Sequence, residues 1–227
     1  MKKAILILLI CFSCYFVYNI TNDNSLYYLN IGDALAMGIT SNNVTTEGYS
    51  IKLKNYLEEN KKLKGYNSSF TNKDYRITDI TKSIKYHDTV IINKDEITIN
   101  ELLKKSDIIT ISLGMNELYY KLFLNKNNIY SYIDGMLEDM QELLIEIDRY
   151  NHQKVIVLGY YNITNSNNDI FTYVNHKLNK IVTKQGFEFI DLNQILNNNT
   201  YFKENSNTFY PEKSAYDKIF QIIVDKI

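Results

Sequence analysis

The protein has 227 residues, of which 45% are hydrophobic and 22% charged, with eight glycines, one proline and no tryptophan. This composition is typical of a globular domain with a substantial core. It excludes a low-complexity disordered chain, a disulfide-rich scaffold and a multispan membrane protein. The formal net charge is −1 at pH 7. Because nucleic-acid-binding domains carry a basic excess, we predict no nucleic-acid partner.

The first 22 residues have the pattern of a membrane-targeting segment. Lys2 and Lys3 precede an apolar run that extends from residue 4 to residue 20, as in the charged and apolar regions of an export signal. As a helix this run would span about 26 Å, slightly less than a bilayer core. No Ala-x-Ala cleavage site follows it. We therefore predict that residues 1–22 form a signal anchor or signal peptide, a hydrophobic helix that places residues 23–227 outside the cytoplasmic membrane.

Both cysteines, Cys11 and Cys14, lie in this targeting segment. The remainder therefore has no thiol for a disulfide or a cysteine-ligated metal site. Lipidation of Cys14, which follows the small residue Ser13, is an alternative anchor. The predicted location is the cell membrane, spanned once, or the extracellular medium if the signal is cleaved. Residues 23–227 hold 23 basic and 26 acidic residues, a net charge of −3, so no binding to anionic surfaces is expected from charge.

Strand and helix patterns alternate along the rest of the chain. Short apolar runs predict strands at 25–31, 107–113, 154–159 and 187–192. Apolar residues at helical spacing predict helices at 48–60, 77–86, 99–105, 129–150, 169–184 and 212–227. A further short strand is expected near Ser69, and residues 87–98 are expected to be a polar link. Strands separated by helices require crossovers, so we predict a single three-layer α/β domain with a parallel, flavodoxin-like sheet.

Chemically informative segments follow the predicted strands, where ligands bind in a sheet of this type. They read NIGDALAMGIT (30–40), KDYRITDI (73–80), SLGMNEL (112–118) and NSNTFYPEKSAYDKI (205–219). In this order they resemble the four sequence blocks of the SGNH (GDSL) hydrolases, a family of esterases and acylhydrolases. The resemblance extends from about residue 26 to the C-terminus. It depends on Gly32-Asp33, on Gly114-x-Asn116 and on a proline that leads into the last helix. It implies an SGNH-hydrolase fold and a cleft for acyl or acetyl esters of lipids or glycans.

The resemblance also implies that the catalytic residues are replaced. The nucleophilic serine of the family falls on Ala34, which has no oxygen to attack an ester carbonyl. The catalytic histidine falls on Tyr210, whose phenol, with a pKa of about 10, cannot act as a base at neutral pH. The aspartate that orients the histidine falls on Asn207. The glycine whose backbone N–H contributes to the oxyanion hole falls on Arg76, and Asn116 is the retained oxyanion-hole side chain.

Other serines and histidines are weak replacements for this triad. Ser41 and Ser50 follow the first turn and Ser112 lies in a predicted strand, so none occupies a sharp turn like that of Ala34. The histidines are expected at the surface and lack metal-ligand spacing: His87, His152 and His176. We therefore predict no metal and no cofactor.

Two further patterns have a binding interpretation. Asp33 and Glu117 are candidates for a carboxylate pair, although an aspartate in such a turn more often accepts backbone N–H groups and holds the turn. Tyrosines at or after predicted strand ends are candidates for an aromatic platform that binds sugar rings: Tyr119, Tyr120, Tyr160, Tyr161 and Tyr210. With 20 tyrosines in the chain, chance placement accounts for most of these.

The prediction is a degenerate SGNH-hydrolase-like protein that is tethered to the membrane by its N-terminus. It would bind an envelope glycan or acyl ligand, or act as a scaffold, without catalysis. The predicted cleft contains Asp33, Arg76, Gly114 and Asn116. Two alternatives remain open: an active esterase or acylhydrolase with a non-standard site, and a structural interaction domain with a closed cleft.

Overall fold

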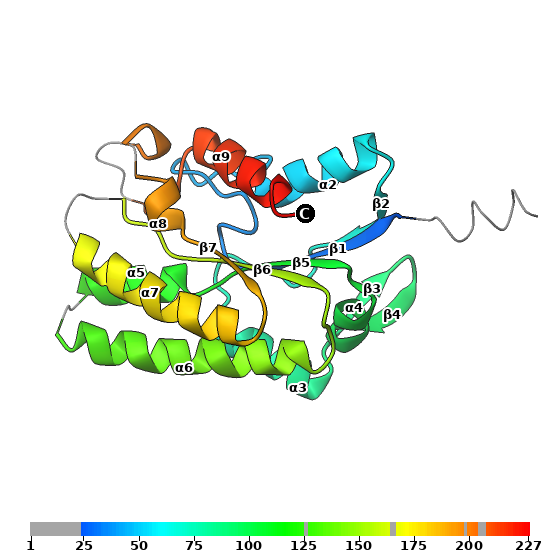
Figure 1. Ribbon diagram of the computed structural model, residues 1–227, viewed down its shortest axis with the longest axis horizontal. Helices are drawn as coiled ribbons and strands as arrows, with labels where there is room; N and C mark the ends of the chain where they lie inside the picture. The colour runs from blue at the N-terminus through cyan, green and yellow to red at the C-terminus, as the bar shows by residue number, and fades with distance from the viewer. Residues whose placement is uncertain (1–23, 125–126, 164–166, 198, 204–207) are drawn as a thin grey trace, which may run out of the picture.

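A parallel sheet flanked by helices forms the body of the protein (Figure 1). The computed structural model describes residues 24–124, 127–163, 167–197, 199–203 and 208–227. The predicted targeting segment 1–22, with its hydrophobic helix, lies outside the described residues. Among the described helices, none has both the length and the apolar character needed to cross a membrane.

The central sheet has five parallel strands in the order β2-β1-β5-β6-β7. Its strands are β1 (Leu26–Gly32), β2 (Leu63–Asn67), β5 (Ile108–Ser112), β6 (Lys154–Leu158) and β7 (Glu188–Ile190). Every residue of β5 is buried, which explains its continuous apolar run. This strand order is that of flavodoxin-like sheets, and it places the binding crevice at the carboxyl ends of the strands.

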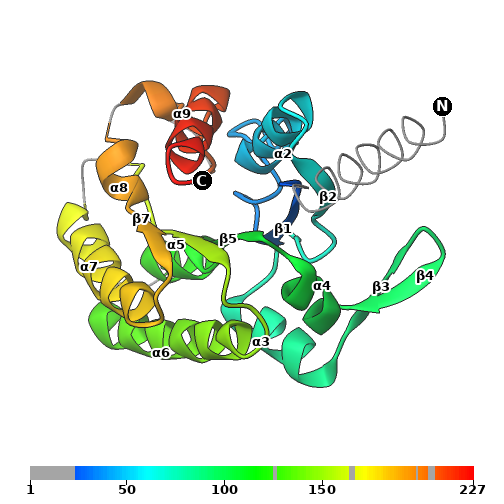
Figure 2. The ribbon, with the colours of Figure 1, turned by 45° about the vertical axis from the view of Figure 1, so that its right-hand side comes forward.

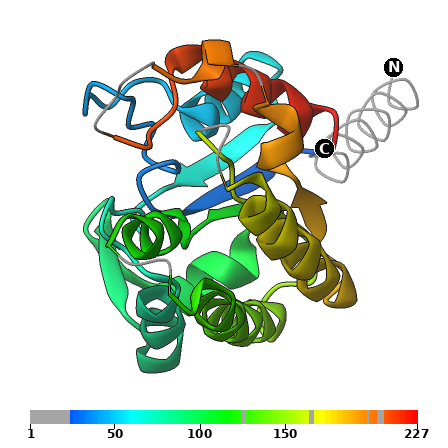
Figure 3. The same ribbon diagram turned by 90° about the vertical axis from the view of Figure 1, so that its left-hand side faces the viewer.

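Helices cover both faces of the sheet, as Figures 2 and 3 show. One face carries α2 (Tyr49–Glu59) and α9 (Lys213–Val224), which pack against each other. The opposite face carries α3 (Ile77–Tyr86), α4 (Ile99–Lys105), α5 (Met115–Leu124), α6 (Ile129–Asp148) and α7 (Asn168–Lys184). The short α8 (Leu192–Ile195) and the 3₁₀ turn η1 (Asn199–Tyr201) lie between β7 and α9. The predicted three-layer α/β fold is confirmed.

Two segments differ from the sequence-based expectation. The strand expected near Ser69 ends at Asn67, because the Ser69 N–H donates to Asn67 Oδ1 at 3.0 Å and turns the chain. The expected polar link is an antiparallel hairpin of β3 (Thr89–Ile92) and β4 (Asp95–Thr98). Asn93 and Lys94 at its tip have φ values of 52° and 78°, as a two-residue type I′ turn requires.

Two helices, α5 and α8, are absent from the sequence-based expectation. Helix α5 begins at Met115, three residues after β5 ends. The apolar pattern therefore passes from strand to helix without the polar linker that would reveal a boundary. Helix α8 is four residues long, too short for a helical repeat to show in the sequence.

A buried polar network lies beneath the turn that follows β1. Asn30 Oδ1 accepts hydrogen bonds from Tyr49 Oη at 3.0 Å and from Thr110 Oγ1 at 2.9 Å. Asn30 Nδ2 donates to the Ala36 carbonyl at 3.1 Å. These buried groups are mutually satisfied, so the network fixes the turn against β5 and α2.

Gly32 lies too close to β5 to accept a side chain, and we predict that Gly32→Ala strongly destabilises the fold. An added Cβ would lie 2.3 Å from the Ser112 carbonyl oxygen and 2.7 Å from Ala36 Cβ. Because backbone must move, the free energy of unfolding should fall by about 3 kcal/mol in urea titrations. The control is Gly135→Ala in α6, where nothing lies within 4 Å of the added Cβ. It should gain roughly 0.5–1 kcal/mol from helix propensity. Equal effects of the two changes would contradict this account.

Candidate functional site

The turn after β1 presents Asp33 and Ala34 at the carboxyl end of the sheet. The Asp33 N–H donates to the Ser112 carbonyl at 2.8 Å, and Asp33 Oδ1 accepts from the Leu35 N–H at 3.1 Å. The side chain therefore holds the turn, as an Asx turn does. Ala34 is 1% exposed. At the position matched to the nucleophile the chain has a buried methyl group and no oxygen.

Asp33 is a buried carboxyl with an incomplete set of partners. Burial raises its pKa to about 7, and the backbone N–H groups of Leu35 and Met115 partly offset this rise. The negative charge of Glu117 raises the pKa further, as a smaller effect. Asp33 Oδ2 has no hydrogen-bond partner among the described residues. The buried carboxylate form is therefore costly, and protonation of Asp33 relieves that cost.

Glu117 lies close to Asp33 but has a structural role of its own. Its Oε2 accepts a hydrogen bond from the Ile77 N–H at 3.1 Å, at the first turn of α3. Burial raises the pKa of Glu117, whereas this hydrogen bond and the charge of Arg76 lower it. The proposed carboxylate pair thus consists of two groups that each hold a turn or a helix end. Of the two, Glu117 lines the cavity described below.

Gly114 and Asn116 follow β5 and form the second part of the site. Gly114 has a φ of +91°, and an added Cβ would lie 2.7 Å from Tyr160 Oη and 2.9 Å from Ile77 Cδ1. Glycine is therefore required where β5 leads into α5. Asn116 Nδ2 donates to the Lys73 carbonyl. Asn116 Oδ1 is buried without a hydrogen-bond partner among the described residues. Nδ2 carries two N–H groups, so this bond engages one donor of the amide that the resemblance matches to the oxyanion hole.

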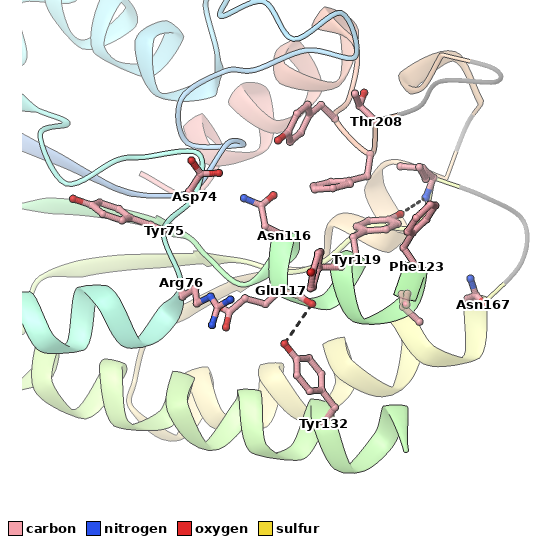
Figure 4. A pocket seen from close by; sticks show the side chains of 15 residues that line it. Asp74, Tyr75, Arg76, Asn116, Glu117, Tyr119, Phe123, Tyr132, Asn167 and Thr208 are labelled. Atoms are coloured by element: carbon pink, nitrogen blue, oxygen red, sulfur yellow. Dashed lines mark hydrogen bonds between the residues drawn. The ribbon is translucent and has the colours of Figure 1, made fainter. Parts of the chain in front are cut away.

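Arg76 lies at the start of α3, where its backbone N–H donates to Asp79 Oδ2 at 2.9 Å. The resemblance implies that this N–H contributes to an oxyanion hole, but it serves here as part of a helix cap. The Arg76 side chain instead lies beside Glu117 at the cavity wall (Figure 4). The Arg76 N–H is thus occupied by the helix cap, and one of the two N–H groups of Asn116 Nδ2 is occupied by the Lys73 carbonyl.

Tyr210 reaches the same end of the sheet from the opposite end of the chain. It is half-buried, and burial raises the pKa of its phenol, with a further rise from the charges of Asp33 and Asp74. Asp33 therefore lies within electrostatic reach of Tyr210 although 177 positions separate them. Asn207, the other residue matched to the triad, lies outside the described residues. A phenol with a raised pKa is no general base at neutral pH.

A cavity of about 890 Å³ opens beside these residues (Figure 4). Seven aromatic side chains line it: Tyr75, Tyr119, Tyr120, Phe123, Tyr132, Phe209 and Tyr210. The charged lining residues are Asp74, Arg76 and Glu117. Aromatic rings beside a few hydrogen-bonding groups suit ligands that have both apolar faces and hydroxyl groups. Sugars are one such class of ligand.

The cavity wall is stiffened by contacts between its aromatic residues. The Tyr119 and Phe209 rings stack at a centroid distance of 4.7 Å and an interplanar angle of 7°. Tyr119 Oη donates to the Tyr161 carbonyl at 3.3 Å and accepts from the Ile163 N–H at 2.9 Å. The ring is thus fixed from both sides.

The sequence-based list of aromatic residues matches the cavity only in part. Tyr119, Tyr120 and Tyr210 line the cavity. Tyr160 and Tyr161 are each 1% exposed and belong to the core. Four aromatic lining residues were missed because they lie in loops or helices and not at predicted strand ends: Tyr75, Phe123, Tyr132 and Phe209. Phe123 and Tyr132 would have required prediction of α5 and of its packing on α6.

The serines and histidines considered as replacements lie outside the cavity lining. Ser50 Oγ donates to the Ala36 carbonyl at 3.1 Å, and Ser41 Oγ donates to Glu212. Ser112 Oγ accepts from Tyr49 Oη at 3.3 Å. The histidines are exposed and absent from the lining set: His87, His152 and His176. In the described part of the chain no group of three His, Cys, Asp or Glu residues is arranged to hold a metal ion.

The three-layer α/β fold matches the fold of several solved hydrolases. Solved structures with this fold include a lipase from a goat rumen metagenome, at 18% identity and a TM-score of 0.72. The match covers 88% of this chain and 97% of the lipase. An acetylxylan esterase from Geobacillus stearothermophilus matches at 13% identity and a TM-score of 0.64, over 88% and 93% of the two chains.

A third solved structure, an alpha/beta hydrolase enzyme from the metagenome of Lake Arreo in Spain, matches at 15% identity and a TM-score of 0.60. The match covers 88% of this chain and 94% of the hydrolase from Lake Arreo. No family model and no curated protein matches the sequence. At these identities the similarity establishes the fold alone: the chain has an SGNH-like hydrolase fold.

Proposed function

We propose that the protein is a membrane-tethered binding protein that retains the cleft of an SGNH-like hydrolase but lacks its catalysis. The observation that carries the proposal is the buried methyl group of Ala34, at the position that the sequence resemblance matches to the nucleophile. A cavity of about 890 Å³ opens at the same end of the sheet. Tyr210, at the position of the base, has a raised pKa. Lys2, Lys3 and the following apolar run support export and tethering.

The proposed ligand is a glycan of the cell envelope or an acylated compound. The aromatic cavity lining supports both, because tyrosine rings contact sugar faces and acyl chains alike. The fold neighbours named above include a lipase and an acetylxylan esterase. An acetylated oligosaccharide combines the two chemistries and is therefore the first ligand to test.

We predict that exposed aromatic residues at the cavity contribute directly to ligand affinity. Tyr120 is 65% exposed and Phe123 is 89% exposed, and both line the cavity. Their replacement by alanine should leave folding intact and weaken binding of an acetylated xylo-oligosaccharide by about 3–10-fold each, by loss of ring contacts. Isothermal titration calorimetry of the full chain in detergent gives the dissociation constants.

The matched control is Tyr86→Ala, because Tyr86 is 77% exposed on α3 and does not line the cavity. This variant should bind like the unmodified protein. Equal weakening by Tyr86→Ala, or no effect of Tyr120→Ala and Phe123→Ala, would show that the ligand does not occupy the cavity.

A further inference from the structure

A group of exposed lysines surrounds the amino-terminal end of β1. The group, which we term the lysine face, consists of Lys61, Lys62, Lys64, Lys104 and Lys105. Leu26 at the start of β1 pairs with Leu63 of β2. The Leu26 N–H donates to the Lys62 carbonyl at 2.6 Å. On the other side of β1, Lys105 Nζ lies 4.3 Å from the centroid of the Tyr27 ring. The lysines thus flank β1 on both sides.

Four acidic residues lie near the lysine face and keep their negative charge, so the five lysines exceed them by one. Asp107 Oδ2 accepts from the Tyr27 N–H at 2.7 Å, Glu101 accepts from Thr98, and Glu58 pairs with Lys54. Glu59 is exposed. Within the described residues, none of the five lysines forms an ion pair with a carboxylate.

Charge is therefore unevenly distributed in a chain whose residues 23–227 carry a net charge of −3. The cavity lining has the opposite balance, since it includes Asp74 and Glu117 against Arg76. We expected no attraction of residues 23–227 to anionic surfaces, but that expectation was based on their net charge alone. A local cluster of lysines attracts anionic lipid headgroups over distances of about a Debye length, whatever the net charge.

We propose that the lysine face binds the surface of an anionic lipid bilayer and directs the cavity away from it. The predicted apolar run ends at residue 20 and β1 begins at Leu26. The five residues between them reach at most about 18 Å. In a tethered chain the amino end of the sheet is therefore the part held at the bilayer. Figure 1 shows β1, β2 and α4 at one end of the molecule and α5 at the other.

This orientation selects between the two proposed ligand classes, and it rests on the proposed binding function. The seven residues of β1 separate the lysine face from the site by about 23 Å. Acyl chains of the supporting bilayer do not reach a cavity at the far end of the sheet. The ligand that fits this geometry is an envelope glycan on the side away from the membrane.

The test is lysine footprinting of the full-length protein on vesicles. Vesicles of phosphatidylcholine, or of phosphatidylcholine mixed with phosphatidylglycerol, are floated with the protein and treated with an amine-acetylating reagent. Mass spectrometry then gives the modification rate of each lysine. On the mixed vesicles the lysine face should react about fivefold more slowly, and high salt should abolish the protection. Lys203 and Lys213, exposed near the cavity end, should react equally on both vesicles.

Charge reversal gives a matched pair of variants. Lys61→Glu with Lys62→Glu should reduce the protection of the remaining lysine face, whereas Lys203→Glu with Lys213→Glu should not. All four side chains are exposed, and circular dichroism verifies folding.

The outcomes separate docking, tethering and ligand binding. Flotation on both vesicle types with identical footprints would overturn docking and leave the tether in place. Flotation on neither would overturn both. Protection of Lys203 and Lys213 would overturn the orientation. Equal protection by a soluble oligonucleotide without vesicles would identify a general polyanion surface and also overturn the proposal. Ligand affinity, measured separately in detergent, tests the cavity alone.

Discussion

The variant Ala34→Ser is expected to hydrolyse p-nitrophenyl acetate no faster than the unmodified protein. A serine at this position gains an oxygen but no base, because the Tyr210 phenol has a pKa raised by burial and by the charges of Asp33 and Asp74. The variant with Ala34→Ser, Asn207→Asp and Tyr210→His supplies the nucleophile, the orienting carboxylate and the base. A positioned general base accelerates a reaction by about 10²–10⁴-fold. The kcat/KM of this triple variant should therefore exceed that of Ala34→Ser by roughly 10²-fold.

The control for this series is the double variant Ala34→Ser with Asn207→Asp, which retains Tyr210 and should remain inactive. A fluorophosphonate probe, which reacts with an activated serine, should label the triple variant and not the natural sequence. The gain is held at the lower end of the range because the Arg76 N–H and one N–H of Asn116 Nδ2 have other partners. Strong labelling of the natural sequence would refute the non-catalytic proposal and make Ser41, Ser50 and Ser112 the next candidates.

Much of the fold could be predicted from the sequence, because its strongest signals are long and periodic. The strands β5 and β6 are buried apolar runs, and α6 has an unbroken apolar stripe. The missed elements depend on short-range chemistry. The β3–β4 hairpin turns at Asn93-Lys94, where positive φ values are adopted without the glycine that usually signals such a turn.

The candidate site was less accessible to sequence reasoning, because it depends on which hydrogen bonds are already made. The positions of Asn116 and Tyr210 at one cavity follow from parallel topology. The engagement of Asn116 Nδ2 by the Lys73 carbonyl does not, since residues 73 and 116 meet only in three dimensions. The same holds for Phe123, which lines the cavity because α5 ends at its rim.

The pH dependence of stability should change most on Asp33→Asn. In the folded protein burial raises the pKa of Asp33 to about 7, whereas in the unfolded chain it is about 3.9. Between these values the folded state binds a proton that the unfolded state has released. The contribution of Asp33 to the free energy of unfolding is therefore most favourable at low pH. It falls as the pH rises toward 7 and is constant above pH 7. Asparagine does not titrate, so Asp33→Asn removes this contribution.

The measured quantity is the difference in free energy of unfolding between Asp33→Asn and the unmodified protein, from urea titrations at several pH values. This difference should increase by on the order of 3 kcal/mol in favour of the variant from pH 5 to pH 8. Any constant cost of the new amide cancels in that comparison. The control is Asp134→Asn, because hydrogen bonds from Lys177 and Tyr173 lower the pKa of Asp134, and its difference should stay level over the same range. A level profile for Asp33→Asn would mean that Asp33 is ionised at pH 5 in the folded protein, with a partner for Oδ2 supplied by solvent.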